Sequence, residues 1–192
     1  SWAMPSTESE YNKAVNELYA YRKALTEVNS QSAQFYARSD NLQDWIQEVT
    51  KRLGSYSQRL SASVGREQLN TDLAGESEAQ QSTYTKSSVV LKTSWWKIDD
   101  EFYEARGACW ALLHFLRAVE IDFNDVLEKK NAKVSVQQII RELEASQESI
   151  WSPMILNGDG FGLLANHSLV MANYISRANA ALIDLNDLLS QG

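Results

Sequence analysis

The chain has 192 residues, a length typical of one domain with a sizeable core, and it contains only two prolines and eight glycines. Acidic residues outnumber basic ones by 25 to 18, and the net charge of −7 argues against nonspecific binding to nucleic acid or anionic lipid, since both need a basic face. Cys109 is the single cysteine, which excludes an internal disulfide. No run reaches the ~18 apolar residues that span a bilayer. Because the chain begins SWAM, without an initial methionine, we expect it to be part of a longer protein.

Two amphipathic helices are predicted in the N-terminal part. The first begins at a capping box of Thr7 and Glu10, and its apolar stripe consists of Tyr11, Val15, Leu18, Leu25 and Val28. The second stops at Gly65, and its stripe consists of Leu42, Trp45, Val49, Leu53, Tyr56, Leu60 and Val64. Because the link near residues 29–32 is short, the two helices are expected to form an antiparallel hairpin.

The chain changes character after the second helix. Residues 66–88 are mostly small and polar and cannot offset the entropy cost of ordering, so a mobile loop is predicted there. The next stretch, VVLKTSWWKI (residues 89–98), is β-branched and aromatic and is expected to be extended and to lie on the helices. One short strand without an evident partner does not predict a sheet.

A third helix is predicted, capped by Asp99 or Asp100 and running to about Lys130. Its apolar residues cover nearly the whole circumference, which indicates a central position in the fold. Gly107 is expected to admit a close neighbour, because glycine otherwise costs about 1 kcal/mol inside a helix. Its main apolar face consists of Phe102, Cys109, Leu112, Leu116, Val119 and Phe123.

Two more helices complete the predicted fold. One starts at a capping box of Ser135 and Gln138 and ends near Ser149. The last begins near Asn166, and its stripe consists of Met171, Ile175, Ala178, Leu182, Leu185 and Leu189. The sequence therefore predicts an all-α fold: a single domain over residues 1–192, built as a helical bundle of about five helices, with a glycine-rich loop before the last helix.

The glycine-rich loop NGDGFG (residues 157–162) resembles several binding motifs. With Gly160 at position six of a calcium loop, positions one and twelve fall on Ile155 and Asn166, which supply no carboxylate. A dinucleotide-binding loop follows a strand, whereas this one follows a helix. We therefore interpret the loop as a turn whose apolar anchors are Phe161, Leu163 and Leu164. Its candidate ligand-binding residues are Trp151, Asn157 and Asp159.

An enzyme interpretation stays open for the same region. The pair Glu148-Ser149 followed by GDGFGLLA is similar to the Glu-Ser and G-x-G-F-G-L-M-Q pattern of some goose-type lysozymes and lytic transglycosylases. In such an enzyme Glu148, in an apolar pocket beside Trp151, would act as the general acid on a glycosidic oxygen. The match fails at Ala165, where the pattern has glutamine.

A second candidate site lies on one face of the third helix, where i+3 and i+4 steps align Tyr103, Arg106, Trp110, His114 and Arg117. An aromatic and cationic stripe of this kind suits an anionic or sugar ligand. In the interpretation we favour, the arginines pair with carboxylates such as Glu104 or Glu142 and the aromatic rings pack in the core.

No metal or cofactor site is predicted. The two histidines, His114 and His167, have neither H-E-x-x-H nor C-x-x-C spacing to support them. Cys109 has no histidine at i+4, so we expect a buried, inert thiol rather than a nucleophile.

Four longer stretches carry a family resemblance: QFYARSDNLQDWI, RLGSYSQRLSASVG, FYEARGACWALLHFLRAVE and WSPMILNGDGFGLLANHSLVMANYISRANAALIDL. From about Ser6 onward the chain resembles a bacterial family of unknown function, numbered 2333 and found mainly in gammaproteobacteria. Members carry an N-terminal membrane-spanning helix, so the resemblance implies the C-terminal domain of an inner-membrane-anchored protein that faces the periplasm. It implies no catalytic or binding residues.

We therefore expect a non-enzymatic domain of the cell envelope whose partner is another envelope protein or peptidoglycan. Nucleic acid is not an expected partner, and the membrane is expected to be contacted only through an N-terminal helix that this chain lacks. The alternative is a peptidoglycan-cleaving enzyme with Glu148 as its general acid.

Overall fold

The computed structural model describes residues 6–27, 32–69, 88–152, 154–158 and 163–191. The chain divides into two compact units, Ser1–Ala37 and Arg38–Gly192, and each is described by itself. The first contains helix α1 (Thr7–Thr26), which is capped by Ser6, one residue before the expected cap: the Ser6 hydroxyl accepts the Ser9 amide at 3.2 Å. The hairpin expected of the first two helices involves both units and stays a prediction.

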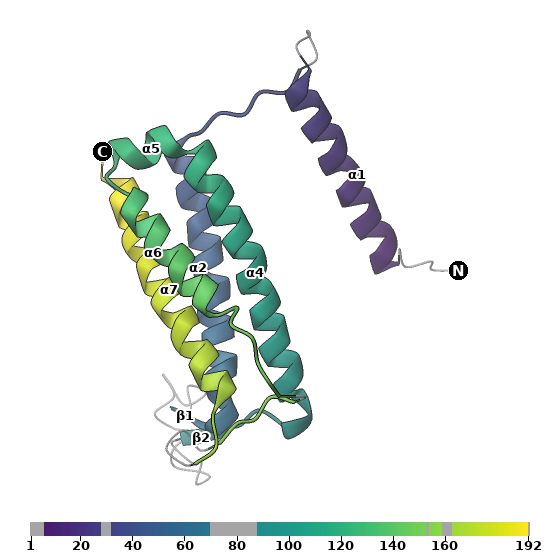
Figure 1. Ribbon diagram of the computed structural model, residues 1–192, viewed down its shortest axis with the longest axis vertical. Coiled ribbons are helices and arrows are strands. Elements are labelled where there is room, and N and C mark those ends of the chain that lie inside the picture. Colours follow the sequence, from purple (N-terminus) through teal and green to yellow (C-terminus); the bar gives the residue numbers. More distant parts are fainter. Residues whose placement is uncertain (1–5, 28–31, 70–87, 153, 159–162, 192) are drawn as a thin grey trace, which may run out of the picture. The chain divides into compact units, whose positions relative to one another are not determined.

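The second unit is a bundle of helices that run alongside one another (Figure 1), and four of them are long. They are α2 (Ser39–Ser61), α4 (Ile98–Asp122), α6 (Lys133–Ala145) and α7 (His167–Ser190). Helix α7 packs most extensively, against α2 and α6, while α4 packs mainly on α6. The described part of the chain contains six α-helices, five of them with seven residues or more, so the predicted all-α bundle of about five helices is confirmed. None of these helices, within the described ranges, has the length and apolarity needed to cross a bilayer.

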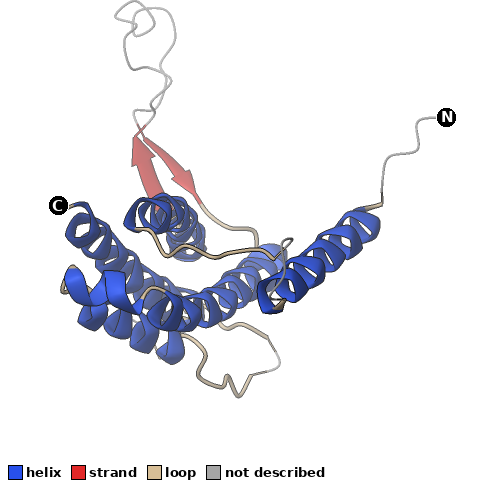
Figure 2. Ribbon diagram, turned by 90° about the horizontal axis from the view of Figure 1, so that it is seen from above, coloured by secondary structure: helices blue, strands red, loops and turns tan. Residues whose placement is uncertain are grey.

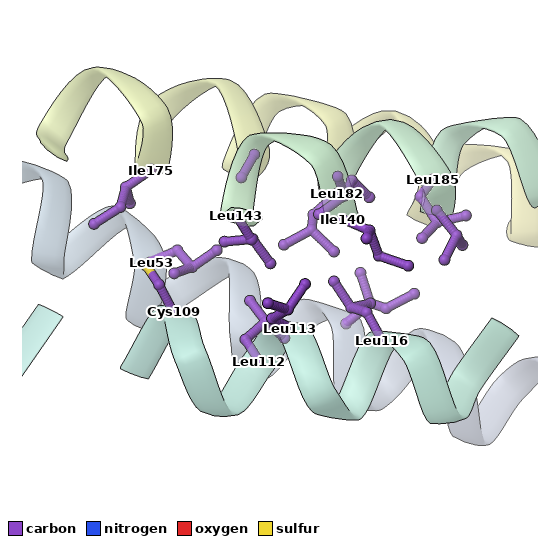
Figure 3. Packing of buried hydrophobic residues seen from close by; sticks show 14 of the residues in the cluster. Leu53, Cys109, Leu112, Leu113, Leu116, Ile140, Leu143, Ile175, Leu182 and Leu185 are labelled. Carbon is purple, nitrogen blue, oxygen red and sulfur yellow. The ribbon is translucent and has the colours of Figure 1, made fainter. Parts of the chain in front are cut away.

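The core lies between these four helices, where leucine and isoleucine side chains interdigitate (Figure 3). All six residues of the stripe predicted for the last helix are buried, and so are all six of the main face of the third. However, α4 is not central: Trp110 is 57% and Ile121 is 76% exposed. Gly107 also has no neighbour, since a Cβ added there would meet nothing within 4 Å. The prediction of a close approach at Gly107 was wrong, because the glycine faces outward.

The third predicted helix is interrupted rather than continuous to Lys130. Backbone dihedrals of −106° and 16° at Phe123 end α4, and a short helix α5 (Asn124–Lys129) turns away across the end of the bundle (Figure 1). Asn131 then adopts a left-handed conformation with φ of 51°, and the Ala132 amide donates to Leu127 O at 2.8 Å. This tight turn lets α6 begin at Lys133, so Ser135 does not cap it as predicted.

A two-stranded hairpin extends from the end of α2 (Figure 2). After a 3₁₀ turn η1 (Ala62–Val64), strand β1 (Arg66–Leu69) pairs antiparallel with β2 (Ser88–Leu91). The prediction of a mobile loop over residues 66–88 was therefore wrong at both ends, and residues 70–87 lie outside the described part. The apolar segment 88–91 does have a partner strand, but that partner is REQL, a polar sequence without a strand signal.

Candidate functional site

One end of the bundle is closed by two irregular segments. A 3₁₀ turn η3 (Trp95–Lys97) leads into α4, and the connection from α6 to α7 crosses to this end (Figure 1). The Asp99 carboxylate accepts the amide of Ile155 at 2.8 Å, which ties the connection to the first turn of α4. The Ile155 side chain is only 5% exposed and packs into the core. Asp99 was predicted as a helix cap, but no side chain caps this helix, and Asp99 instead holds the connection.

Arg106 fixes the other end of this connection. Its guanidinium donates to Gln147 O at 2.7 Å and to Glu148 O at 2.9 Å, just beyond the C-terminus of α6. The Gln147 side-chain amide donates back to Arg106 O at 3.2 Å. A cation close to the C-terminus of a helix is a favourable arrangement, because that end of the helix dipole is negative. Arg106 therefore positions the chain, and the expected pairing with Glu104 or Glu142 was wrong.

Two asparagines clamp the base of the glycine-rich loop. Asn157 and Asn166 form an antiparallel bridge, and the Gly158 amide donates to Ala165 O at 3.1 Å. The Asn157 side chain donates to the Ser168 hydroxyl at 2.8 Å and accepts the Ser168 amide at 3.0 Å. The Asn166 side chain caps α7 by accepting the amide of Leu169. The Asn157 side chain thus makes structural hydrogen bonds to Ser168. The two flanks of the loop are hydrogen-bonded to each other, as the turn interpretation requires.

The apolar anchors expected for this turn were placed wrongly. Leu163 is 107% and Leu164 is 65% exposed, so neither packs on the bundle. Phe161 and Asp159 lie outside the described residues. At Gly158 an added Cβ would lie 2.3 Å from Leu164 O, so the two flanks approach too closely for any side chain. The turn is therefore held by polar contacts and by this close approach of its flanks, and not by the apolar anchors that were predicted.

Several large apolar side chains of these segments point to solvent. Trp151 is 99% exposed, Trp96 is 82% exposed, and Trp95 packs edge to face on Trp96 with centroids 4.8 Å apart. We call this surface the tryptophan-bearing end and define it as Trp95, Trp96, Trp151, Met154, Leu163 and Leu164. Trp95 and Trp96 were missed as site residues because they were assigned to the extended segment 89–98. Their adjacency in a polar neighbourhood was the available signal.

A groove of about 230 Å³ lies beside Trp151, between α4, the end of α6 and the start of α7. Glu148, Trp151, Arg106, His167 and Tyr174 are among its lining residues, which places the proposed catalytic glutamate next to the expected tryptophan. The Glu148 side chain is exposed, and it makes no hydrogen bond or ion pair with the described residues. The groove thus brings the two residues together without enclosing the carboxyl group.

The remaining residues of the α4 stripe are not among the residues that line this groove. Trp110 packs edge to face on His114, with centroids 4.4 Å apart, and both are exposed. Tyr103 is 51% exposed and packs on Phe102. Arg117 pairs with Glu144 at 2.7 Å, a carboxylate partner as predicted but a different one. The expectation that these aromatic rings pack in the core was wrong, and no pocket described for this chain joins the five residues.

The other charged and nucleophilic groups serve the fold. Arg59 of α2 forms two hydrogen bonds, of 2.9 and 3.0 Å, to Glu104 of α4, and this contact lowers the pKa of the Glu104 carboxyl. Burial raises the pKa of the Cys109 thiol to about 11, as suits the inert thiol predicted. In the described ranges no three histidine, cysteine or acidic residues gather into a metal-binding group.

Comparison with known proteins gives one match. The model of a family described as an uncharacterized protein conserved in bacteria, DUF2333, matches residues 1–192. No curated protein and no solved structure matches the chain.

Proposed function

We propose, for this chain, which belongs to the bacterial family DUF2333, a non-enzymatic binding function in the cell envelope. The observation that carries the proposal is the tryptophan-bearing end, where three tryptophans, a methionine and two leucines are exposed on segments tied to the bundle. The envelope location rests on the resemblance to membrane-anchored members of the family.

Exposure of this kind favours recognition of a partner. Large apolar side chains exposed on a folded domain are typical of interaction sites, and tryptophan is among the residues most enriched where binding energy is concentrated. The supporting backbone is held by Asp99, Arg106 and Asn157, so the aromatic side chains need little reorganisation to bind.

The composition of the surface favours a protein partner over a glycan. Sugars are recognised by aromatic faces and polar groups, whereas Met154, Leu163 and Leu164 add aliphatic area. We therefore rank an apolar patch on another envelope protein as the first candidate partner, and peptidoglycan as the second.

The lysozyme-like alternative is supported by one observation, the shared groove of Glu148 and Trp151. In a lysozyme-like enzyme the general acid lies in an apolar enclosure, whereas the Glu148 side chain is exposed. Glu148 is also the one carboxylate among the residues described as lining the groove, whereas glycosidases normally use two. The groove therefore supports binding more than acid catalysis.

The test compares wild type with Trp151→Ala and Glu148→Gln. The matched control is Trp110→Ala, which removes a tryptophan that is 57% exposed but lies on α4, outside the tryptophan-bearing end. Each protein is incubated with purified sacculi, and both sedimentation and soluble glycan fragments are measured. In parallel, a photo-reactive phenylalanine analogue replaces Trp96 in each protein, and crosslinked envelope proteins are identified by mass spectrometry.

We expect one reproducible crosslinked protein, lost with Trp151→Ala and kept with Trp110→Ala and Glu148→Gln, and no released fragments. Sedimentation that depends on Trp151, without fragments, would make the wall the partner. Fragments released by wild type and not by Glu148→Gln would overturn the proposal in favour of the enzyme.

A further inference from the structure

Helix α1 carries an apolar stripe that the other described residues of its own unit leave exposed. None of its residues is buried, although Tyr11 is 70%, Leu18 is 66% and Leu25 is 39% exposed. The opposite side of the helix, with Asn12, Lys13 and Asn16 as its outer residues, is polar. An amphipathic helix with a bare apolar side requires a partner surface.

The stripe repeats every seven residues. Tyr11, Leu18 and Leu25 are spaced by seven, and Ala14 and Tyr21 form a second row three residues behind the first. These rows are the a and d positions of a heptad repeat, whose mean spacing of 3.5 residues favours two helices that supercoil around each other. The 20 residues of α1 extend over about 30 Å, enough for almost three heptads.

The charges beside the stripe identify the partner. In this frame Glu17 is a g position and Arg22 is the following e position, which are the two positions that face each other between parallel helices. Two copies of α1 in parallel register form this pair twice. Antiparallel copies would instead bring Glu17 near Glu17 of the other copy. We propose that α1 forms a parallel two-stranded coiled coil with α1 of a second copy of this chain.

Both charged groups are available for such a pair. Arg22 lies over the ring of its neighbour Tyr19, 5.3 Å from the centroid, and Tyr19 is a b position outside the seam. Glu17 makes no ion pair with the described residues. A Glu17–Arg22 pair between two copies would therefore break no ion pair that the structure describes for either residue. The ion pair of Lys23 with Glu27 lies on the outer side of the helix, away from the seam.

The first test is sedimentation of the full chain over a concentration series that reaches about 1 mM, where even weak association is visible. Wild type is compared with Leu18→Lys, at the seam, and Tyr19→Lys, a matched control of the same charge on the adjacent exposed residue. We expect a wild-type dimer, a Kd at least about 100-fold weaker for Leu18→Lys, and a change of about twofold or less for Tyr19→Lys.

A wild type that stays monomeric throughout the series overturns the proposal. If Leu18→Lys then lowers the thermal midpoint of that monomer, the stripe belongs to the fold of a single chain. Equal loss of association with Tyr19→Lys also overturns it, because the b position has no role in the seam.

The second test concerns orientation. Glu17→Arg and Arg22→Glu each place like charges opposite in a parallel pair and are expected to weaken the dimer about tenfold. The double variant Glu17→Arg/Arg22→Glu restores opposite charges and the wild-type Kd. A double variant as weak as the single ones overturns the parallel arrangement.

Discussion

The bundle core and the tryptophan-bearing end distribute apolar side chains in opposite ways. In the core, Leu143 of α6 and Ile175 and Leu182 of α7 are 0% exposed and belong to one packed cluster (Figure 3). At the tryptophan-bearing end, Trp151 is 99% and Leu163 is 107% exposed. The backbone of the first region is positioned by apolar packing, and that of the second by side-chain hydrogen bonds to main-chain groups.

This difference separates stability from recognition. A surface segment fixed by carboxylate, amide and guanidinium contacts to its own backbone keeps its apolar side chains free for a partner. Mutations in the core should therefore change the free energy of unfolding, and mutations of the exposed tryptophans should change binding alone.

Leu182→Ala is expected to have the largest effect. Leu182 is fully buried in α7, and removal of its side chain leaves a cavity that costs about 2–5 kcal/mol of unfolding free energy. The matched variant Ile183→Ala removes a similar side chain that is 47% exposed, and it should cost about 1 kcal/mol or less. Urea denaturation followed by circular dichroism measures both. Equal losses would mean that α7 has no distinct buried face.

Asn157→Ala should have the next largest effect. It removes both hydrogen bonds to Ser168, whose side chain is only 2% exposed, and leaves its amide and hydroxyl unpaired. A buried polar group without a partner costs about 1–3 kcal/mol. The control, Asn173→Ala, changes an exposed asparagine of α7 and should cost about 0.5 kcal/mol or less. If the two variants unfold at the same urea concentration, Asn157 does not clamp the loop.

The core could be predicted from the sequence because the apolar period of a helix directly reports its buried face. The stripes from Met171 to Leu189 and from Phe102 to Phe123 are buried as predicted. The same kind of stripe in α1, from Tyr11 to Leu25, is exposed throughout. Periodicity thus identifies the face of a helix that seeks apolar contact, and it does not identify the partner.

The tryptophan-bearing end could not be predicted, because its contacts join residues far apart in the chain. Asp99 and Ile155 are 56 residues apart, and Arg106 and Gln147 are 41 apart. From the neighbouring sequence alone, a carboxylate at the start of a helix indicates a cap, and an arginine on a helix indicates an ion pair. Both were predicted in those local roles, and both instead bind the main chain of a distant segment.

Gly158→Ala tests the close approach at the base of the loop. An added Cβ would lie 2.3 Å from Leu164 O, so one flank must move, and we expect a loss of about 1–3 kcal/mol. Gly107→Ala provides the contrast, since the added methyl group meets nothing within 4 Å inside α4. It should raise the unfolding free energy by about 0.5–1 kcal/mol, because alanine favours helix over glycine. Stabilisation by both variants would contradict the described loop geometry.

Trp151→Ala should have the smallest effect on stability and the sharpest effect on binding. The side chain is 99% exposed, so its removal exposes almost no new apolar surface, and the change in unfolding free energy should stay within about 0.5 kcal/mol. If Trp151 is a principal contact, the partner's Kd should rise by about 30-fold or more, the size expected for a buried interface tryptophan. The unfolding measurement needs no knowledge of the partner and can come first. A loss above about 1 kcal/mol would show that Trp151 supports the fold. The division between a packed core and an end whose side chains are free to bind a partner would then fail at the most exposed of its tryptophans.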